Sequence, residues 1–92
     1  MLFTQEFVVQ PYLQSPTLSS IHILWETDSG SESKVEWGSW QTLGEVTTGM
    51  SITSYGSNKL HTVQLTGLYT SARYYYRVIT GNLTSEIYDF IM

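Results

Sequence analysis

Short runs of alternating apolar and polar residues are the feature that most constrains how this chain can fold. In the clearest run, residues 20–27, the side chains of Ile21, Ile23 and Trp25 fall on one face. Alternation with a period of two is typical of a β-strand with one buried face. Because no segment shows the period of an amphipathic helix, the sequence predicts an all-β domain.

Similar runs recur along the chain, separated by clusters of Gly, Ser, Asn and Asp. We expect strands at residues 4–10, 20–27, 34–38, 44–48, 51–54, 60–66, 73–80 and 84–91, with one or two edge strands in the Gly-, Ser- and Thr-rich middle. Pro11 should end the first strand because it cannot donate to a ladder. Gly81-Asn82 is a two-residue hairpin signal. About seven short strands in 92 residues favour a two-sheet antiparallel sandwich of the immunoglobulin-like type.

Three residues are expected to specify the core of this sandwich. Trp25 lies in the middle of its strand and should pack between the sheets as the largest core side chain. Leu68 lies in the connection between the expected strands 60–66 and 73–80, which we call the corner. Tyr74 lies at the start of the second of these strands. A tyrosine in this position can fill the core with its ring while its hydroxyl satisfies a buried carbonyl at the corner.

Composition excludes several classes of function. The chain carries four Lys plus Arg against eight Asp plus Glu, so it has no basic footprint for duplex nucleic acid. It has no cysteine, which rules out disulfides and thiolate metal sites. Its apolar runs are four residues or shorter, so we expect no membrane-spanning segment. The first twenty residues lack the basic start of a signal peptide.

No arrangement of residues in the sequence predicts catalysis. His22 and His61 have no partners at metal-ligand spacing, so we interpret His22 as a solvated or interface residue and His61 as a hydrogen-bonded, partly buried one. Glu26 and Asp28 flank a turn and are expected to lie in water. The glycines are spread singly, which gives no phosphate-binding loop. We therefore expect no catalytic, cofactor-binding or metal-binding residue in this chain.

The aromatic residues, 14% of the chain, exceed what one small core can absorb. Tyr75 and Ile79 alternate away from the core residues of their strand, and Ile87 and Ile91 match them on the neighbouring strand. Arg77 and Asp89 interrupt this apolar stripe on the outer face. The stripe is either a docking surface or is covered by loops or an edge strand. The candidate interface residues are Tyr75, Ile79, Ile87 and Ile91, with Trp40 and Tyr12 as loop-borne candidates.

Several blocks of the chain, taken together in order and spacing, resemble a known family. They are residues 11–14 (PYLQ), 23–27 (ILWET), 35–38 (VEWG), 61–68 (HTVQLTGL), 73–78 (RYYYRV) and 88–90 (YDF). The family is the purple acid phosphatase N-terminal domain. The chain departs from its pattern at residues 70–72, where a Pro-Gly-Thr run is usual, and at Trp37, where tyrosine is common.

The resemblance implies a single fibronectin type III-like domain over residues 1–92, lying ahead of a calcineurin-type metallophosphoesterase domain in the same chain. In that family the catalytic domain holds the dinuclear metal centre, while the N-terminal domain supplies packing and sometimes contacts between the subunits of a homodimer. The implied role is a non-catalytic accessory domain of a secreted, periplasmic or cell-surface phosphatase whose signal peptide is absent from this sequence. The alternative is a free-standing adhesion or carbohydrate-binding module of the cell surface.

Overall fold

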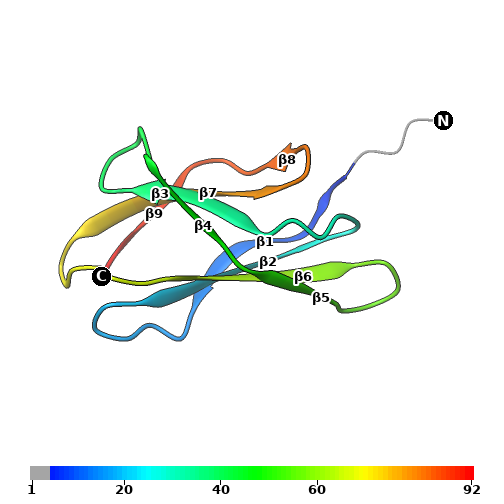
Figure 1. The fold of residues 1–92 in the computed structure, drawn as a ribbon, viewed down its shortest axis with the longest axis horizontal. Coiled ribbons are helices and arrows are strands. Elements are labelled where there is room, and N and C mark those ends of the chain that lie inside the picture. Colours follow the sequence, from blue (N-terminus) through cyan, green and yellow to red (C-terminus); the bar gives the residue numbers. More distant parts are fainter. Residues whose placement is uncertain (1–4) are drawn as a thin grey trace.

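The described structure consists of strands in which apolar and polar residues alternate, and the apolar faces of these strands pack together. The computed structural model describes residues 5–92, which contain strands and turns and no helix. The strands are β1 (Phe7–Gln14), β2 (Ile21–Thr27), β3 (Lys34–Gly38), β4 (Glu45–Thr48), β5 (Met50–Thr53), β6 (Lys59–Leu65), β7 (Arg73–Thr80), β8 (Leu83–Thr84) and β9 (Tyr88–Ile91). Figure 1 shows them as two layers along the long axis. The prediction of an all-β sandwich is confirmed.

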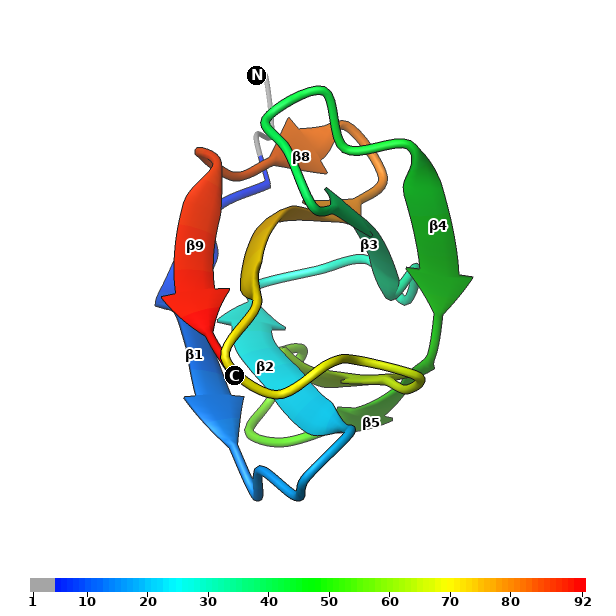
Figure 2. The ribbon, with the colours of Figure 1, turned by 90° about the vertical axis from the view of Figure 1, so that its left-hand side faces the viewer.

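The strands form one four-stranded and one five-stranded antiparallel sheet. The order in the first is β1-β2-β6-β5, and in the second β4-β3-β7-β8, with β9 also paired to β7. The edge strands β1 and β9 of the two sheets lie side by side (Figure 2). Between β4 and β5 the chain crosses from one sheet to the other at Gly49, where a β-carbon would overlap the Thr62 carbonyl. Glycine is therefore required at this crossing.

The core lies between the inward faces of both sheets and is centred on Trp25. Its buried members are Ile21, Ile23, Trp25, Val35, Val63, Leu65, Leu68, Tyr74, Tyr76, Val78 and Phe90. The predicted inward faces of residues 20–27, 60–66 and 73–80 are all confirmed by this set. Trp25 is fully buried, and its indole N–H donates to Thr80 Oγ1 at 2.9 Å, so the largest core side chain has no unpaired polar atom.

Tyr74 forms the predicted link to the corner, although with the opposite hydrogen-bond direction. Its ring is buried beside Leu68, and the Tyr69 backbone N–H donates to Tyr74 Oη at 2.7 Å. The hydroxyl was expected to satisfy a carbonyl, and instead it accepts from an amide. The chain turns just before this amide at Gly67, whose φ of +70° is one that glycine adopts readily.

Replacing Tyr74 with phenylalanine should destabilise the domain by about 1–2 kcal/mol, because the Tyr69 amide loses its acceptor. Urea unfolding at neutral pH measures this change. Tyr55→Phe is the matched control, since Tyr55 is 83% exposed. Equal unfolding midpoints for the two variants would show that the corner hydrogen bond contributes nothing.

Two strand predictions were wrong. β1 continues through Pro11 to Gln14, and its pairing with β2 shifts register between Val9 and Tyr12. As an edge strand with an irregular ladder, it accommodates a residue that lacks an N–H. The strand expected at 84–91 is divided into β8 and β9, which raises the number of strands to nine. Residue 4, the expected start of the first strand, lies outside the described residues.

Candidate functional site

Three loops and the last residue of the chain meet at one end of the sandwich. These loops connect β1 to β2, β3 to β4 and β6 to β7, and Figure 2 looks directly onto them. The Leu68 N–H donates to the Ser19 carbonyl at 2.9 Å, which joins two of the loops. The Met92 N–H donates to the Ala72 carbonyl at 2.9 Å. Any residue that follows Met92 therefore leaves the domain from this end.

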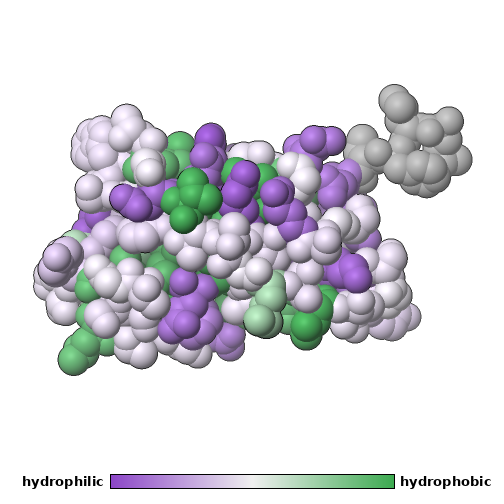
Figure 3. Space-filling model, in the orientation of Figure 1, coloured by the Kyte–Doolittle hydropathy of each residue, from purple (hydrophilic) through white to green (hydrophobic). Residues whose placement is uncertain are grey.

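Four large apolar side chains are exposed around this end. Leu18 in the β1–β2 loop is 83% exposed, Tyr69 in the β6–β7 loop 77%, Trp40 in the β3–β4 loop 62%, and Ile91 at the end of β9 61%. We call this end of the sandwich, with its three loops and these four residues, the C-terminal end. Figure 3 shows hydrophobic side chains protruding beyond the β1–β2 loop here. Apolar groups that gather on one surface are typical of a docking site.

Backbone strain is concentrated at the same end. Three residues other than glycine have a positive φ in the described part of the chain: Ser15 at 53°, Leu43 at 65° and Ser71 at 66°. Each lies in a different one of the three loops. Such conformations cost free energy and collect at functional sites, where the surrounding structure holds them in place. The strain supports a functional role for these loops.

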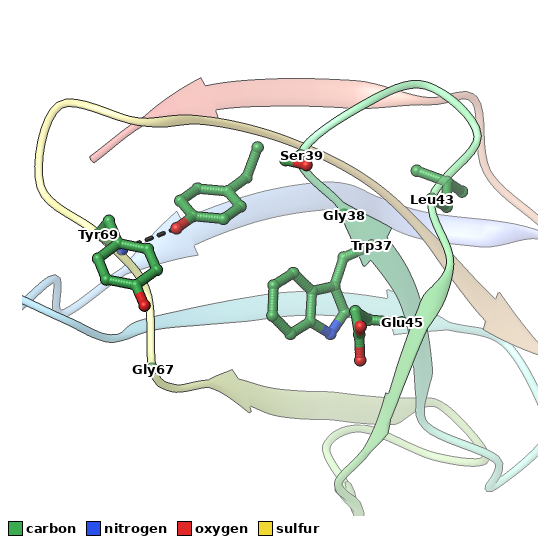
Figure 4. A pocket seen from close by; sticks show the side chains of 8 residues that line it. Trp37, Gly38, Ser39, Leu43, Glu45, Gly67 and Tyr69 are labelled. Carbon is green, nitrogen blue, oxygen red and sulfur yellow. Dashed lines mark hydrogen bonds between the residues drawn. The ribbon is translucent and has the colours of Figure 1, made fainter.

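A pocket of about 320 Å³ opens at this end between the five-stranded sheet and the β6–β7 loop (Figure 4). Its lining comes from β3, β4, β7 and the β3–β4 and β6–β7 loops and consists of Trp37, Gly38, Ser39, Leu43, Glu45, Gly67, Tyr69 and Tyr74. The β3–β4 loop folds back so closely that a β-carbon at Gly38 would overlap the Leu43 carbonyl. Glycine at position 38 therefore allows this wall of the pocket to form.

The structure brings three of the predicted interface residues to this end. Trp40 packs edge-on against Tyr75, with ring centroids 5.8 Å apart, and so covers part of the outer face of β7. Ile91 pairs with Arg73 at the start of the same strand. Tyr75 is half-buried as a result, whereas Trp40 and Ile91 are exposed.

The other predicted interface residues lie elsewhere. Ile79 is at the far end of β7, beyond an ion pair in which Arg77 Nε lies 2.7 Å from Glu36 Oε1. Ile87 precedes β9 and is not part of it. Tyr12 belongs to β1 rather than to a loop. It lies in the four-stranded sheet, where it pairs with Leu24 of β2. Two ion pairs, Arg77–Glu36 and Arg73–Asp89, interrupt the predicted stripe.

Sequence reasoning missed an apolar surface on the outer face of the β1-β2-β6-β5 sheet. Met50 and Ile52 on the edge strand β5 are 70% and 59% exposed. They pair with Thr62 and Leu60 of β6, next to the outward-facing Leu24. The alternation of apolar and polar residues in β2 places Leu24 outward. The strand β5 has only four residues, too few for the same pattern to reveal this surface.

His61 is fully buried rather than partly buried as predicted, and it belongs to a polar network inside the core. Its ring stacks on Trp25, with centroids 5.1 Å apart. Thr27 Oγ1 lies 2.8 Å from His61 Nε2, and Ser33 Oγ lies 2.8 Å from His61 Nδ1. Because the Thr27 hydroxyl donates its proton to the Ser29 carbonyl, Nε2–H donates to Thr27 and Nδ1 accepts from Ser33. Burial, reinforced by the positive charge of Lys59, lowers the pKa of His61 and favours this neutral form.

The remaining ionisable groups show no catalytic arrangement in residues 5–92. No group of three or more His, Asp or Glu side chains gathers in this range, so the described residues do not fit a dinuclear metal centre. His22 is half-buried, and its Nδ1 has no hydrogen-bond partner in this range. Burial, followed by the nearby Tyr88 and Asp89, raises the pKa of Tyr76 to about 12, so this phenol keeps its proton at neutral pH.

Fold and site together define the class of protein, an antiparallel β-sandwich with exposed apolar and aromatic side chains at one end. Within the described part of the chain, no helix is long and apolar enough to cross a membrane. The family model described as Purple acid Phosphatase, N-terminal domain, matches residues 8–92. The chain therefore belongs to this family, whose N-terminal domain is non-catalytic. No curated protein matches the chain.

Proposed function

We propose that this domain is an accessory module that docks through its C-terminal end onto a metallophosphoesterase domain following Met92. The single observation that carries the proposal is the position of the exposed apolar residues. Leu18, Trp40 and Tyr69 surround the point from which the chain would continue. A following domain would meet these side chains first, and burying them would stabilise the contact.

Contact with a second copy of the chain is the other part of this proposal. The outer face of the β1-β2-β6-β5 sheet supports it, because Met50 and Ile52 expose apolar surface away from the C-terminal end. In both contacts the domain binds and positions a neighbour. The metal ions and the chemistry would belong to the neighbouring domain.

Hydrogen exchange measured by mass spectrometry tests the docking surface. We expect amides in the loops at residues 15–20 and 66–72 to exchange more slowly in a chain that includes the catalytic domain than in residues 1–92 alone. Replacing Leu18 and Tyr69 with serine should remove this protection, because exposed anchors typically contribute about 1–3 kcal/mol each to association. The matched control is Tyr55→Ser, because Tyr55 is 83% exposed and lies outside this end.

Protection confined to β5 and β6, with no change in the three loops, would overturn docking at the C-terminal end.

The non-catalytic role has its own test. Residues 1–92 alone should not hydrolyse p-nitrophenyl phosphate in the presence of iron, zinc or manganese. Turnover that a chelator abolishes would contradict the accessory role directly.

A further inference from the structure

We infer that the pocket at the C-terminal end receives an arginine side chain from the docked partner. The inference rests on the proposed function, because it specifies the chemistry of the surface that docks there. Its basis is the meeting of three aromatic rings with one carboxylate that has no ion-pair partner within residues 5–92. Nothing in the sequence alone places these groups together.

Two of the three aromatic walls, Trp37 and Tyr74, are held by contacts with their neighbours. The Trp37 indole N–H donates to Thr47 Oγ1 at 2.9 Å, which fixes the orientation of the ring. Trp37 and Tyr74 pack edge to face, with centroids 6.0 Å apart and planes at 61°. Tyr69 approaches from the β6–β7 loop, and Figure 4 shows the Trp37 indole between Tyr69 and Glu45. Tryptophan and tyrosine faces attract cations that lie within about 6 Å of the ring centre.

Glu45 supplies the negative charge of the pocket. It is the cross-strand partner of Trp37, so its carboxylate lies next to the indole on the edge strand β4. The acids on the outer face of the same sheet are already neutralised, since Asp89 pairs with Arg73 and Glu36 pairs with Arg77. The whole chain has a net charge of −4, which favours a basic partner.

The geometry favours a guanidinium over other occupants. A guanidinium is planar, stacks on aromatic rings and forms paired hydrogen bonds with a carboxylate, whereas an ammonium acts as a point charge. The volume of about 320 Å³ is near the lower limit of ligand pockets, about 300 Å³, and suits one side chain rather than an oligosaccharide. One donor that a sugar would need is already used, because the Trp37 N–H bonds to Thr47 Oγ1.

Titration of residues 1–92 with N-acetylarginine amide, followed by NMR, tests the inference. We expect saturable shifts of the Trp37 indole N–H and the Tyr69 amide, with a dissociation constant of about 1–10 mM for one isolated side chain. N-acetylcitrulline amide, which has nearly the same shape without the charge, should bind at least about fivefold more weakly.

The variant Glu45→Gln should lose about fivefold to tenfold in affinity for the arginine probe, because it keeps the shape of the pocket and removes its charge. Glu86→Gln removes the same charge from an exposed residue that lines a different pocket, and it should bind as the native chain does. Equal binding of the arginine and citrulline probes, or unchanged affinity of Glu45→Gln, would overturn the inference.

A saccharide is the competing occupant, and cellobiose is the probe for it. Shifts of the same two signals with cellobiose but not with the arginine probe would overturn the inference in favour of sugar binding. These titrations do not involve a catalytic domain. A negative result would therefore exclude the arginine pocket without bearing on docking, while the exchange experiment tests docking without bearing on the pocket.

Discussion

Replacing Trp25 with alanine should lower the free energy of unfolding by about 3–5 kcal/mol, the largest effect we expect from any single substitution. Trp25 is fully buried between the sheets, so the change leaves a large cavity. It also removes the hydrogen bond to Thr80 and the stacking with His61. Domains of this length have total stabilities of about 5–14 kcal/mol, so the variant would lose much of its stability.

Urea unfolding followed by far-UV circular dichroism measures this loss without relying on tryptophan fluorescence. Trp40→Ala is the matched control, because Trp40 is 62% exposed and its removal should cost less than about 1 kcal/mol. If the alanine variant does not fold, Trp25→Phe still tests the claim. It keeps an apolar ring but loses the N–H, and should cost about 1–3 kcal/mol. Equal stabilities of the Trp25 and Trp40 variants would contradict the placement of the core.

The core could be predicted from the sequence because it depends on alternation, which is a local property. The residues on one face of Arg73–Thr80 were assigned correctly from the spacing of Tyr74, Tyr76 and Val78 alone. Pro11 was assigned wrongly because the rule that excludes proline from strands applies to central strands, and β1 is an edge strand with an irregular register.

The pocket could not be predicted because it depends on contacts between distant segments. It requires the β3–β4 loop to fold over Gly38 with Leu43 in a left-handed conformation, which leucine rarely adopts. It also requires the register that sets Glu45 beside Trp37. Neither condition leaves a signal in the local pattern. The partners of His61 are similarly distant, since Ser33 and Thr27 lie 28 and 34 residues away.

His61 should make the domain less stable as the pH falls below 6.5. Burial lowers the pKa of His61 in the folded state below the value of 6.5 that it has when exposed. Between these two pKa values, the unfolded chain binds a proton that the folded chain does not, so the free energy of unfolding increases with pH. The full contribution is present above pH 6.5 and is lost as the pH falls toward the folded pKa. For one proton, the slope within this window approaches about 1.4 kcal/mol per pH unit.

Urea unfolding at a series of pH values between about 5 and 8 measures this slope, in a range above the ordinary pKa values of carboxylates, about 4. His61→Gln should be less stable than the native chain at pH 8, because Thr27 and Ser33 lose the imidazole that they contact. The same variant should lack the decline below pH 6.5, since the titrating group is gone. His22→Gln removes the other histidine of the chain and should retain the decline. If His61→Gln retains the decline, the buried imidazole does not control acid stability.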